Sequence, residues 1–330
     1  MTLFRTALTD RLGIRLPMLA GGLMWLGDAD YVAAAANAGI LGFITAASFP
    51  DDADLTAEIA RARRLCGDRP FGVNVSMLPK LVPGERTEYL FRLIADEGIT
   101  VVETSGRNPE PYMPLLKDLG LTVIHKVPAV RFAKKAQAVG VDMVSIVGAE
   151  CGGHPGMDMI GSFVNAAMAG RDLTIPFLIG GGVGHGSQLV AALAMGASGV
   201  VLGTRLLVAE ELNAHPAYKA AIAGASERDT ALTMQSVRNT VRSLANDTTQ
   251  AVARMEAENP DITIADLMPL VSGKIGRRAY QTGDVSKGLL SAGHALGLTN
   301  AVAPMAEIIA QIEVEAQAAL ARLDAVRVPA

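Results

Sequence analysis

The fold prediction starts from one strand-and-loop unit, Met143-Val144-Ser145-Ile146-Val147-Gly148-Ala149-Glu150-Cys151-Gly152-Gly153-His154-Pro155-Gly156. Residues 143–148 are nearly all apolar and predict a buried strand, and a segment of helical character follows the loop. A histidine in a glycine-rich loop at the C-terminal end of a strand is typical of an active site in an α/β protein. Glycine lets the backbone approach a flat ligand, and histidine exchanges a proton near neutral pH.

The same unit, a strand followed by a helix, recurs through the first two thirds of the chain. Most of the predicted strands are continuous apolar runs, as expected for a parallel sheet covered on both faces. They are Pro17–Gly22, Gly42–Ala47, Phe71–Ser76, Thr100–Gly106, Thr122–Val127, Met143–Gly148, Pro176–Gly182 and Gly199–Arg205. Segments between them, such as Ala53–Leu65 and Ala129–Val139, carry apolar residues at helical spacing. This succession predicts a TIM (β/α)8 barrel, with a doubly wound sheet as the alternative.

The chain changes character after the eighth predicted strand. Residues 207–290 are more polar and mostly helical in pattern, with Met234–Leu244 as one predicted helix and no strand of comparable length. The final stretch, Pro304–Val326, is long and amphipathic and predicts the eighth barrel helix. We therefore expect an α/β fold in which residues 1–206 and 291–330 form the barrel. Residues 207–290 would form a second, mainly helical domain inserted over its mouth.

The composition argues against several classes of protein. The 330 residues are half hydrophobic and have a formal net charge of −4, with no basic run suited to nucleic acid. Residues 31–50 and 175–204 are uncharged, but glycines break each of them into pieces too short to cross a membrane. Cys66 and Cys151 show neither metal-ligand spacing nor a disulfide framework. We expect a cytoplasmic protein that binds neither nucleic acid nor membrane; monomer and homodimer both stay open.

Two glycine-rich turns follow the seventh and eighth predicted strands. These are the loops of a TIM barrel that commonly bind phosphate. The backbone N–H groups that could converge on phosphate oxygens are those of Gly180, Gly181, Gly182, Gly203 and Thr204. The alternative is that these glycines are ordinary turn residues. The chain has neither a Gly-x-Gly-x-x-Gly motif near its start nor a Walker lysine, so a different nucleotide-binding fold is not expected.

Ionisable side chains also lie at the ends of predicted strands. Lys126 should point into the mouth, where a cation would stabilise negative charge on a reduced ring system. The alternative is an ion pair between Lys126 and either Glu103 or Glu150. His154 is the predicted base or hydrogen-bond donor, and a structural loop histidine is its alternative.

Two weaker hypotheses concern His125 and Cys151. His125 is expected to be a structural barrel residue beside Lys126. Cys151 lies three residues before His154, so a thiol–imidazole pair is conceivable, although a small core residue is the simpler interpretation. No second cluster of ligands supports a zinc site.

In order and spacing, several segments resemble the nitronate monooxygenase family, formerly called 2-nitropropane dioxygenases, which includes NAD(P)H:quinone reductases. The similar segments are Pro17–Gly22, Arg69–Asn74, Val101–Gly106, His125-Lys126, Glu150–Gly156, Gly180–Gly182, Leu202–Arg205, Arg238–Thr240 and Ser272–Asp284. The resemblance runs nearly end to end. It implies a TIM barrel with a helical second domain and FMN held non-covalently between them.

The resemblance also implies roles for individual residues. Those that would bind the FMN phosphate are Gly180, Gly181, Gly182, Gly203 and Thr204. Those that would line the isoalloxazine ring and ribityl chain are Gly22, Leu23, Met24, Ser76, Lys126 and Gly152. His154 matches the family's catalytic histidine.

Four functions follow from these expectations. The leading hypothesis is oxidation of an alkyl nitronate, with FMN passing electrons to O2 and His154 binding the nitronate oxygens or removing an α-proton. The first alternative is an NAD(P)H:quinone reductase that uses NADH or NADPH, with the loop Met77–Glu85 gating nicotinamide entry. The others are an FMN-dependent enoyl reductase and a flavin-binding protein without turnover.

Overall fold

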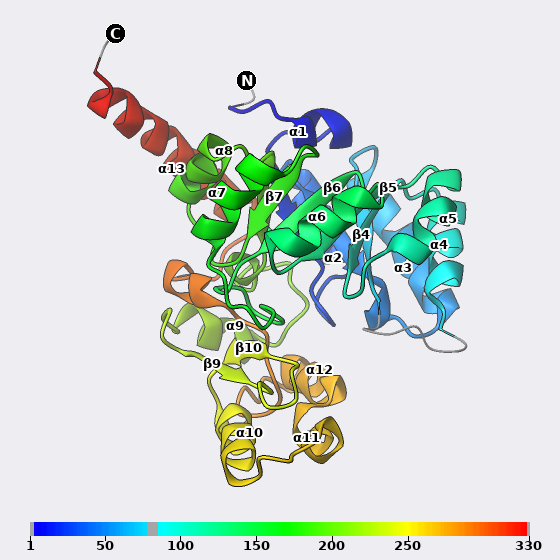
Figure 1. Ribbon diagram of the computed structural model, residues 1–330, viewed down its shortest axis with the longest axis vertical. Helices are drawn as coiled ribbons and strands as arrows, with labels where there is room; N and C mark the ends of the chain where they lie inside the picture. Colours follow the sequence, from blue (N-terminus) through cyan, green and yellow to red (C-terminus); the bar gives the residue numbers. More distant parts are fainter. Residues whose placement is uncertain (1–2, 78–84, 329–330) are drawn as a thin grey trace.

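The computed structural model describes residues 3–77 and 85–328, and its eight parallel strands form one closed barrel (Figure 1). The strands are β1 (Met18–Ala20), β2 (Leu41–Thr45), β3 (Gly72–Ser76), β4 (Val101–Ser105), β5 (Thr122–Val127), β6 (Met143–Val147), β7 (Phe177–Gly180) and β8 (Gly199–Leu202). They pair in sequence order, and β1 closes the barrel against β8 with Leu19 opposite Val201. The predicted TIM barrel is confirmed; each predicted strand agrees with its observed bounds to within three residues, and Thr122–Val127 agrees at both ends.

Helices cover the outside of the barrel. They are α2 (Ala29–Asn37), α3 (Asp52–Cys66), α4 (Thr87–Asp96), α5 (Met113–Asp118), α6 (Val130–Ala138), α7 (Ser162–Asp172), α8 (Gly186–Ala194) and α13 (Met305–Val326). Helix α3 illustrates why they form: Asp51 caps its N-terminus, and its buried residues Leu55, Ile59 and Ala62 recur at helical spacing. Helix α13 packs against α8 and α2, and so completes the ring as predicted.

A short helix closes one end of the barrel. Helix α1 (Ala7–Leu12) brings Leu8 and Leu12 into a buried cluster with strand side chains such as Phe43 and Ile124. This end lies opposite the second domain in Figure 1. The N-terminal end of the barrel is therefore apolar and plugged, which leaves the C-terminal ends of the strands for a ligand.

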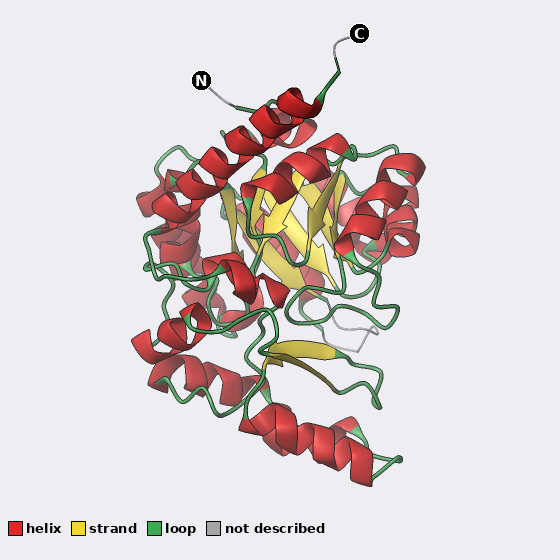
Figure 2. Ribbon diagram, turned by 90° about the vertical axis from the view of Figure 1, so that its left-hand side faces the viewer, coloured by secondary structure: helices red, strands yellow, loops and turns green. Residues whose placement is uncertain are grey.

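The segment between β8 and α13 lies over the C-terminal ends of the strands (Figures 1 and 2). Its elements are α9 (Pro216–Ala223), β9 (Thr230–Thr233), β10 (Val241–Leu244), α10 (Asp247–Glu258), α11 (Ile264–Val271) and α12 (Gly273–Thr282). The segment also contains the 3-10 helices η3 (Thr204–Leu206) and η4 (His294–Leu298), while η1 (Ala46–Ser48) and η2 (Glu110–Tyr112) lie in the barrel, after β2 and β4. A small core of its own includes Met234, Val252 and Leu267. The boundaries at residues 207 and 290 stay a prediction, since Tyr218 and Ile222 of α9 pack into the main core.

The prediction of a helix over Met234–Leu244 is wrong. Residues 241–244 form β10, which pairs antiparallel with β9, Val241 lying opposite Thr233. Both strands are as long as β7 and β8, so the expectation of no comparable strand is wrong as well. The spacing of Val237, Val241 and Leu244 suits a helix, but partners elsewhere in the chain decide the conformation of a short segment.

None of the helices in the described parts of the chain combines the length and the apolar character that a membrane crossing requires.

Candidate active site

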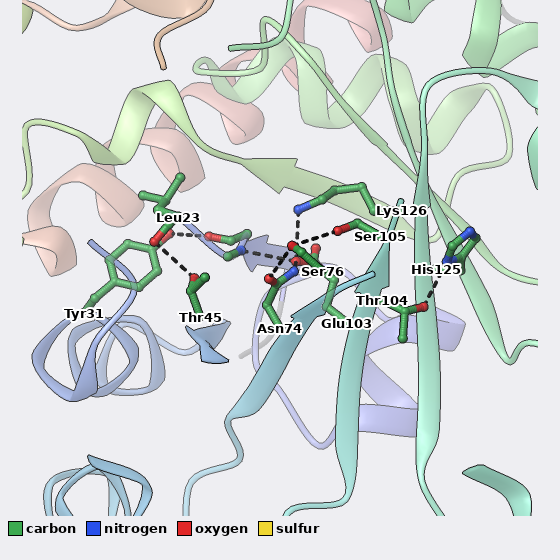
Figure 3. A network of polar contacts seen from close by, with 12 residues as sticks. Leu23, Tyr31, Thr45, Asn74, Ser76, Glu103, Thr104, Ser105, His125 and Lys126 are labelled. Carbon is green, nitrogen blue, oxygen red and sulfur yellow. Dashed lines mark hydrogen bonds and ion pairs between the residues drawn. The ribbon is translucent and has the colours of Figure 1, made fainter. Parts of the chain in front are cut away.

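A buried carboxylate lies at the centre of the barrel mouth. The side chain of Glu103 on β4 is fully buried, and its Oε2 accepts hydrogen bonds from Asn74 Nδ2 at 2.6 Å, Lys126 Nζ at 3.0 Å and the Gly22 N–H at 3.3 Å (Figure 3). Its Oε1 has no partner in the described residues, and the same is true of the Ser145 hydroxyl on β6. Donors from two strands, β3 and β5, and from the turn after β1 therefore converge on one carboxylate oxygen of β4.

The ion pair that the sequence left as an alternative for Lys126 is present. Its partner is Glu103 rather than Glu150. The Lys126 side chain is 22% exposed while that of Glu103 is 0% exposed, so the ammonium borders the mouth and the carboxylate lies beneath it. Lys126 is thus held in place by an anion and still faces the space where a ligand would lie.

The ends of β1 and β3 carry other predicted residues to this mouth. Ser76 Oγ lies 3.1 Å from Ser105 Oγ and donates to Asn74 Oδ1 at 3.3 Å (Figure 3). A Cβ on Gly22 would lie 2.6 Å from the Cβ of Asn74, so glycine is needed there. Met24 is 46% exposed, unusually so for a methionine, and offers an apolar surface at the rim.

Two backbone carbonyls of the turn after β1 accept hydrogen bonds from side-chain hydroxyls. The Tyr31 hydroxyl donates to the Gly21 carbonyl at 3.0 Å, and the Thr45 hydroxyl donates to the Leu23 carbonyl at 3.1 Å (Figure 3). Burial raises the pKa of Tyr31, so it stays a hydrogen-bond donor. The backbone of this turn is therefore preorganised.

The turn after β7 is built from glycines in a left-handed conformation. Gly180 ends the strand, and Gly181 and Gly182 follow with φ of 91° and 73°. A Cβ on Gly181 would lie 2.8 Å from the Gly148 N, so the turn packs closely on the loop after β6. Residues with side chains rarely adopt this backbone conformation, which is why glycines are needed here.

The turns after β7 and β8 present unused hydrogen-bond donors. Throughout residues 3–77 and 85–328, no protein acceptor takes the N–H groups of Gly181, Gly182, Gly203 or Thr204. Nothing lies within 4 Å of the position that a Cβ on Gly203 would occupy. Backbone N–H groups are nearly always satisfied, so these two turns could hold an anion with oxygen acceptors.

The loop that carries His154 is tied to the second domain. Gly153 exchanges two backbone hydrogen bonds with Arg242 of β10, at 2.9 and 2.7 Å. The buried Arg242 guanidinium donates to the Ala149 carbonyl at 3.2 and 3.1 Å. A Cβ on Gly152 would lie 2.8 Å from backbone atoms of Ala292, so the chain returning from the second domain also packs on this loop. The barrel and the segment between β8 and α13 thus both position His154.

His154 is a neutral imidazole with access to solvent. Although the side chain is exposed at its outer edge, partial desolvation of the ring by the surrounding loop lowers its pKa from 6.5, while the Asn239 side chain acts in the other direction. A neutral histidine near pH 7 can accept a proton or donate a hydrogen bond.

The weaker candidates do not join this arrangement. His125 is buried, its Nδ1 lies 2.9 Å from Thr104 Oγ1, and burial lowers its pKa to about 4 (Figure 3). Burial raises the pKa of Cys151 to about 12, which disfavours a thiolate nucleophile. In the described residues, no cluster of three metal-ligating side chains occurs.

Sequence reasoning missed two features of the site. One is Arg242, which the structure shows holding the loop that carries His154. The other is backbone strain, since the non-glycine residues with positive φ in the described chain are Trp25, Met159, Met234 and Arg238. All of them lie in the loops after β1 and β6 or in the β9–β10 hairpin. Strained residues concentrate at functional sites, but only coordinates reveal them.

Comparisons with known proteins agree with this architecture. The family model described as nitronate monooxygenase matches residues 5–315. FabK from Thermotoga maritima is 32% identical with a TM-score of 0.89, covering 98% of this chain and 100% of that one. Nitroalkane oxidase from Streptomyces ansochromogenes is 26% identical with a TM-score of 0.80, covering 96% and 100%.

A curated relative matches over a shorter stretch. The (3aS,4S,5R,7aS)-5-hydroxy-7a-methyl-1-oxo-octahydro-1H-indene-4-carboxyl-CoA dehydrogenase from Mycobacterium tuberculosis is 35% identical over 218 residues, 65% of this chain. The chain spans 59% of the length of that relative. With the family model covering nearly its whole length, the chain belongs to the nitronate monooxygenase family and is an oxidoreductase.

Proposed function

We propose that the protein binds FMN and oxidises alkyl nitronates, or the nitroalkanes from which they form, with O2 as electron acceptor. The single observation that carries the flavin assignment is the pair of turns with unused N–H groups, at Gly181, Gly182, Gly203 and Thr204. A phosphate ester supplies charged oxygen acceptors that suit such a cradle. Gly180 ends the strand that leads into it, and the open space at Gly203 leaves room for the ligand.

The remaining predicted contacts suit the ring end of the same cofactor. Residues proposed to line the isoalloxazine and ribityl chain are Gly22, Leu23, Met24, Ser76, Lys126 and Gly152. The Lys126 ammonium, held by Glu103 at 3.0 Å, would place positive charge beside the ring. FMN supplies the two-electron redox centre when bound.

His154 is the proposed catalytic residue. Because its lowered pKa keeps the imidazole neutral, it can accept the α-proton of a nitroalkane or donate a hydrogen bond to a nitronate oxygen. The loop's attachment to Arg242 and Ala292 would hold the ring in one orientation while the substrate reacts. The family membership and the likeness to a nitroalkane oxidase support this choice of substrate.

A second candidate is reduction of a coenzyme A thioester, an enoyl group or a quinone, with NADH or NADPH as the electron source. The observation that favours it is the likeness to FabK over nearly the whole chain, together with the partial match to a carboxyl-CoA dehydrogenase. The predicted gate over Met77–Glu85 falls largely on residues 78–84, which lie outside the described residues. It therefore adds nothing to either candidate.

Anaerobic stopped-flow mixing separates the two candidates. Rapid bleaching of the flavin by propionate 3-nitronate supports the proposed function, while bleaching by NADH or NADPH with no response to the nitronate would overturn it. His154→Ala should lower the rate at least ~100-fold and keep the flavin bound, as expected for loss of a general base. His185→Asn is the matched control, since asparagine preserves the helix cap that His185 provides to α8.

A further inference from the structure

A cavity of about 470 Å³ lies between the loop after β1, the segment around η1, the middle of α3, the residues that lead into α9, and helix α12. We call it the Trp25 cavity; the residues that line it are Trp25, Asp28, Ser48, Phe49, Glu58, Arg61, Asn213, Ala214, His215, Arg277, Tyr280 and Gln281. Its volume falls in the range of small-molecule sites. Trp25 follows directly after Gly22, Leu23 and Met24, so the cavity adjoins the segment proposed to contact the flavin.

The acidic groups of this cavity are already engaged. Asp28 caps α2 by accepting the Tyr31 N–H at 3.0 Å. Glu58 Oε1 accepts the Ala29 N–H at 2.6 Å and Arg61 Nη1 at 3.1 Å. These carboxylates hold the loop and the helices together, and leave little acceptor capacity for a ligand.

The unused groups of the cavity are donors. In the described chain, Arg277 makes no ion pair, and its guanidinium lies 4.9 Å from the centre of the Trp25 ring. The Trp25 Nε1–H is buried without an acceptor. His215 Nδ1 accepts the Ala217 N–H at 3.1 Å, which leaves Nε2 to carry the proton of the neutral ring. A ligand that satisfies these groups must be rich in acceptors and is best negatively charged.

Trp25 is also strained. Its φ is 68°, a left-handed conformation that bulky residues rarely adopt, and its backbone N–H donates a hydrogen bond to the Ser48 hydroxyl at 2.7 Å. Strain of this kind concentrates where a ligand is bound. The indole is therefore held in place against the local backbone preference, with Arg277 stacked on one face.

We propose that the Trp25 cavity binds the adenosine phosphate end of an extended co-substrate whose reactive end reaches the flavin. Arg277, the indole N–H and His215 would bind phosphate, and the aromatic wall of Trp25 and Phe49 would contact the flat base. A lone phosphate or carboxylate would leave most of the cavity unfilled. The proposal rests on the second candidate function, because NAD(P)H and coenzyme A thioesters both carry this group.

The chain contains one tryptophan, so its fluorescence reports on this cavity directly. The probes are AMP, 2′,5′-ADP and 3′,5′-ADP, fragments of NADH, NADPH and coenzyme A that carry no redox group, titrated into the flavin-loaded protein. We expect saturable binding of at least one fragment, seen in Trp25 emission and in calorimetry. The fragment that binds tightest identifies the source: 3′,5′-ADP indicates a coenzyme A thioester, 2′,5′-ADP indicates NADPH and AMP indicates NADH.

Variants of neighbouring arginines test the geometry. Arg277→Ala should weaken fragment binding at least ~10-fold, the loss expected for charge-assisted hydrogen bonds to phosphate. Arg278→Ala is the matched control, since Arg278 is exposed on the same helix and does not line the cavity. Trp25→Phe keeps an aromatic ring at this position but removes the indole N–H, and should weaken binding in calorimetry.

Three outcomes would overturn the proposal: no fragment binds, both arginine variants lose binding equally, or inorganic phosphate binds as tightly as the nucleotides. Bleaching of the flavin by NADH and NADPH is measured on the same preparation. A negative titration with normal bleaching refutes the Trp25 cavity alone, whereas absent bleaching with normal fragment binding refutes only the second candidate function.

Discussion

Removing Lys126 should destabilise the protein more than removing Glu103, although the two form one ion pair. Lys126→Met would leave the carboxylate of Glu103, which is 0% exposed, with only Asn74 and the Gly22 N–H as donors. Removing one partner of a buried ion pair costs roughly 3–5 kcal/mol in free energy of unfolding. Glu103→Gln leaves an ammonium whose side chain is already 22% exposed and can gain water at the mouth. We expect a cost of about 1–2 kcal/mol, that of a weakened hydrogen bond.

Chemical denaturation followed by circular dichroism measures this asymmetry, with all variants at the same flavin occupancy. The double variant Glu103→Gln/Lys126→Met should cost less than the sum of the single variants by about 1 kcal/mol or more, because the partners are in contact. Arg5→Ala is the control, since its pair with Asp10 is exposed by 84% and 52% and should contribute less than about 1 kcal/mol. Equal costs for the two single variants, or strict additivity in the double variant, would refute this account of the mouth.

Three further outcomes are expected. Burial lowers the pKa of His125 from 6.5 to about 4, so between these pH values the unfolded chain binds more protons than the folded protein. The free energy of unfolding should therefore fall by about 3 kcal/mol as the pH drops from 6.5 to 4. In His125→Gln, the slope of the unfolding free energy against pH should be flatter over this range. Gly203→Ala should keep the melting temperature of the protein yet bind flavin at least ~10-fold more weakly, since its Cβ would enter the open space between the two turns. Gly181→Ala should weaken flavin binding and also lower the melting temperature, because Gly181 has φ of 91°; equal melting shifts for the two variants would contradict this distinction. Asn239→Ala removes the group that raises the pKa of His154, so the acid limb of the pH–rate profile should move to lower pH; an unmoved limb would separate Asn239 from His154.

Much of the barrel was predictable because its signals are local. A strand of a covered parallel sheet is apolar on both faces, so runs such as Thr122–Val127 stand out without knowledge of their neighbours. The amphipathic pattern of α13 likewise identified the closing helix. The segment Met234–Leu244 failed because its pairing with β9 and with Gly153 outweighs local spacing.

The site divides in the same way. The glycine turns after β7 and β8 could be placed at one end of the barrel, because parallel strands bring all their C-terminal ends together. The partner of Lys126 could not be chosen between Glu103 and Glu150. That choice depends on which side chains point inward at the same height, with Glu103 and Lys126 on neighbouring strands.

The order of apolar and glycine-rich segments alone determined the barrel, and it predicted the end at which a ligand would bind and the histidine offered to it. Only the tertiary structure decided that Glu103 lies beneath Lys126, that Arg242 holds a loop 93 residues earlier in the chain, and that Trp25 and Arg277 share a cavity. Periodicity and turn composition act over a few residues and can be seen in a linear chain. Burial, ion pairing and cavity shape depend on contacts between distant segments, and these exist only after the barrel has closed.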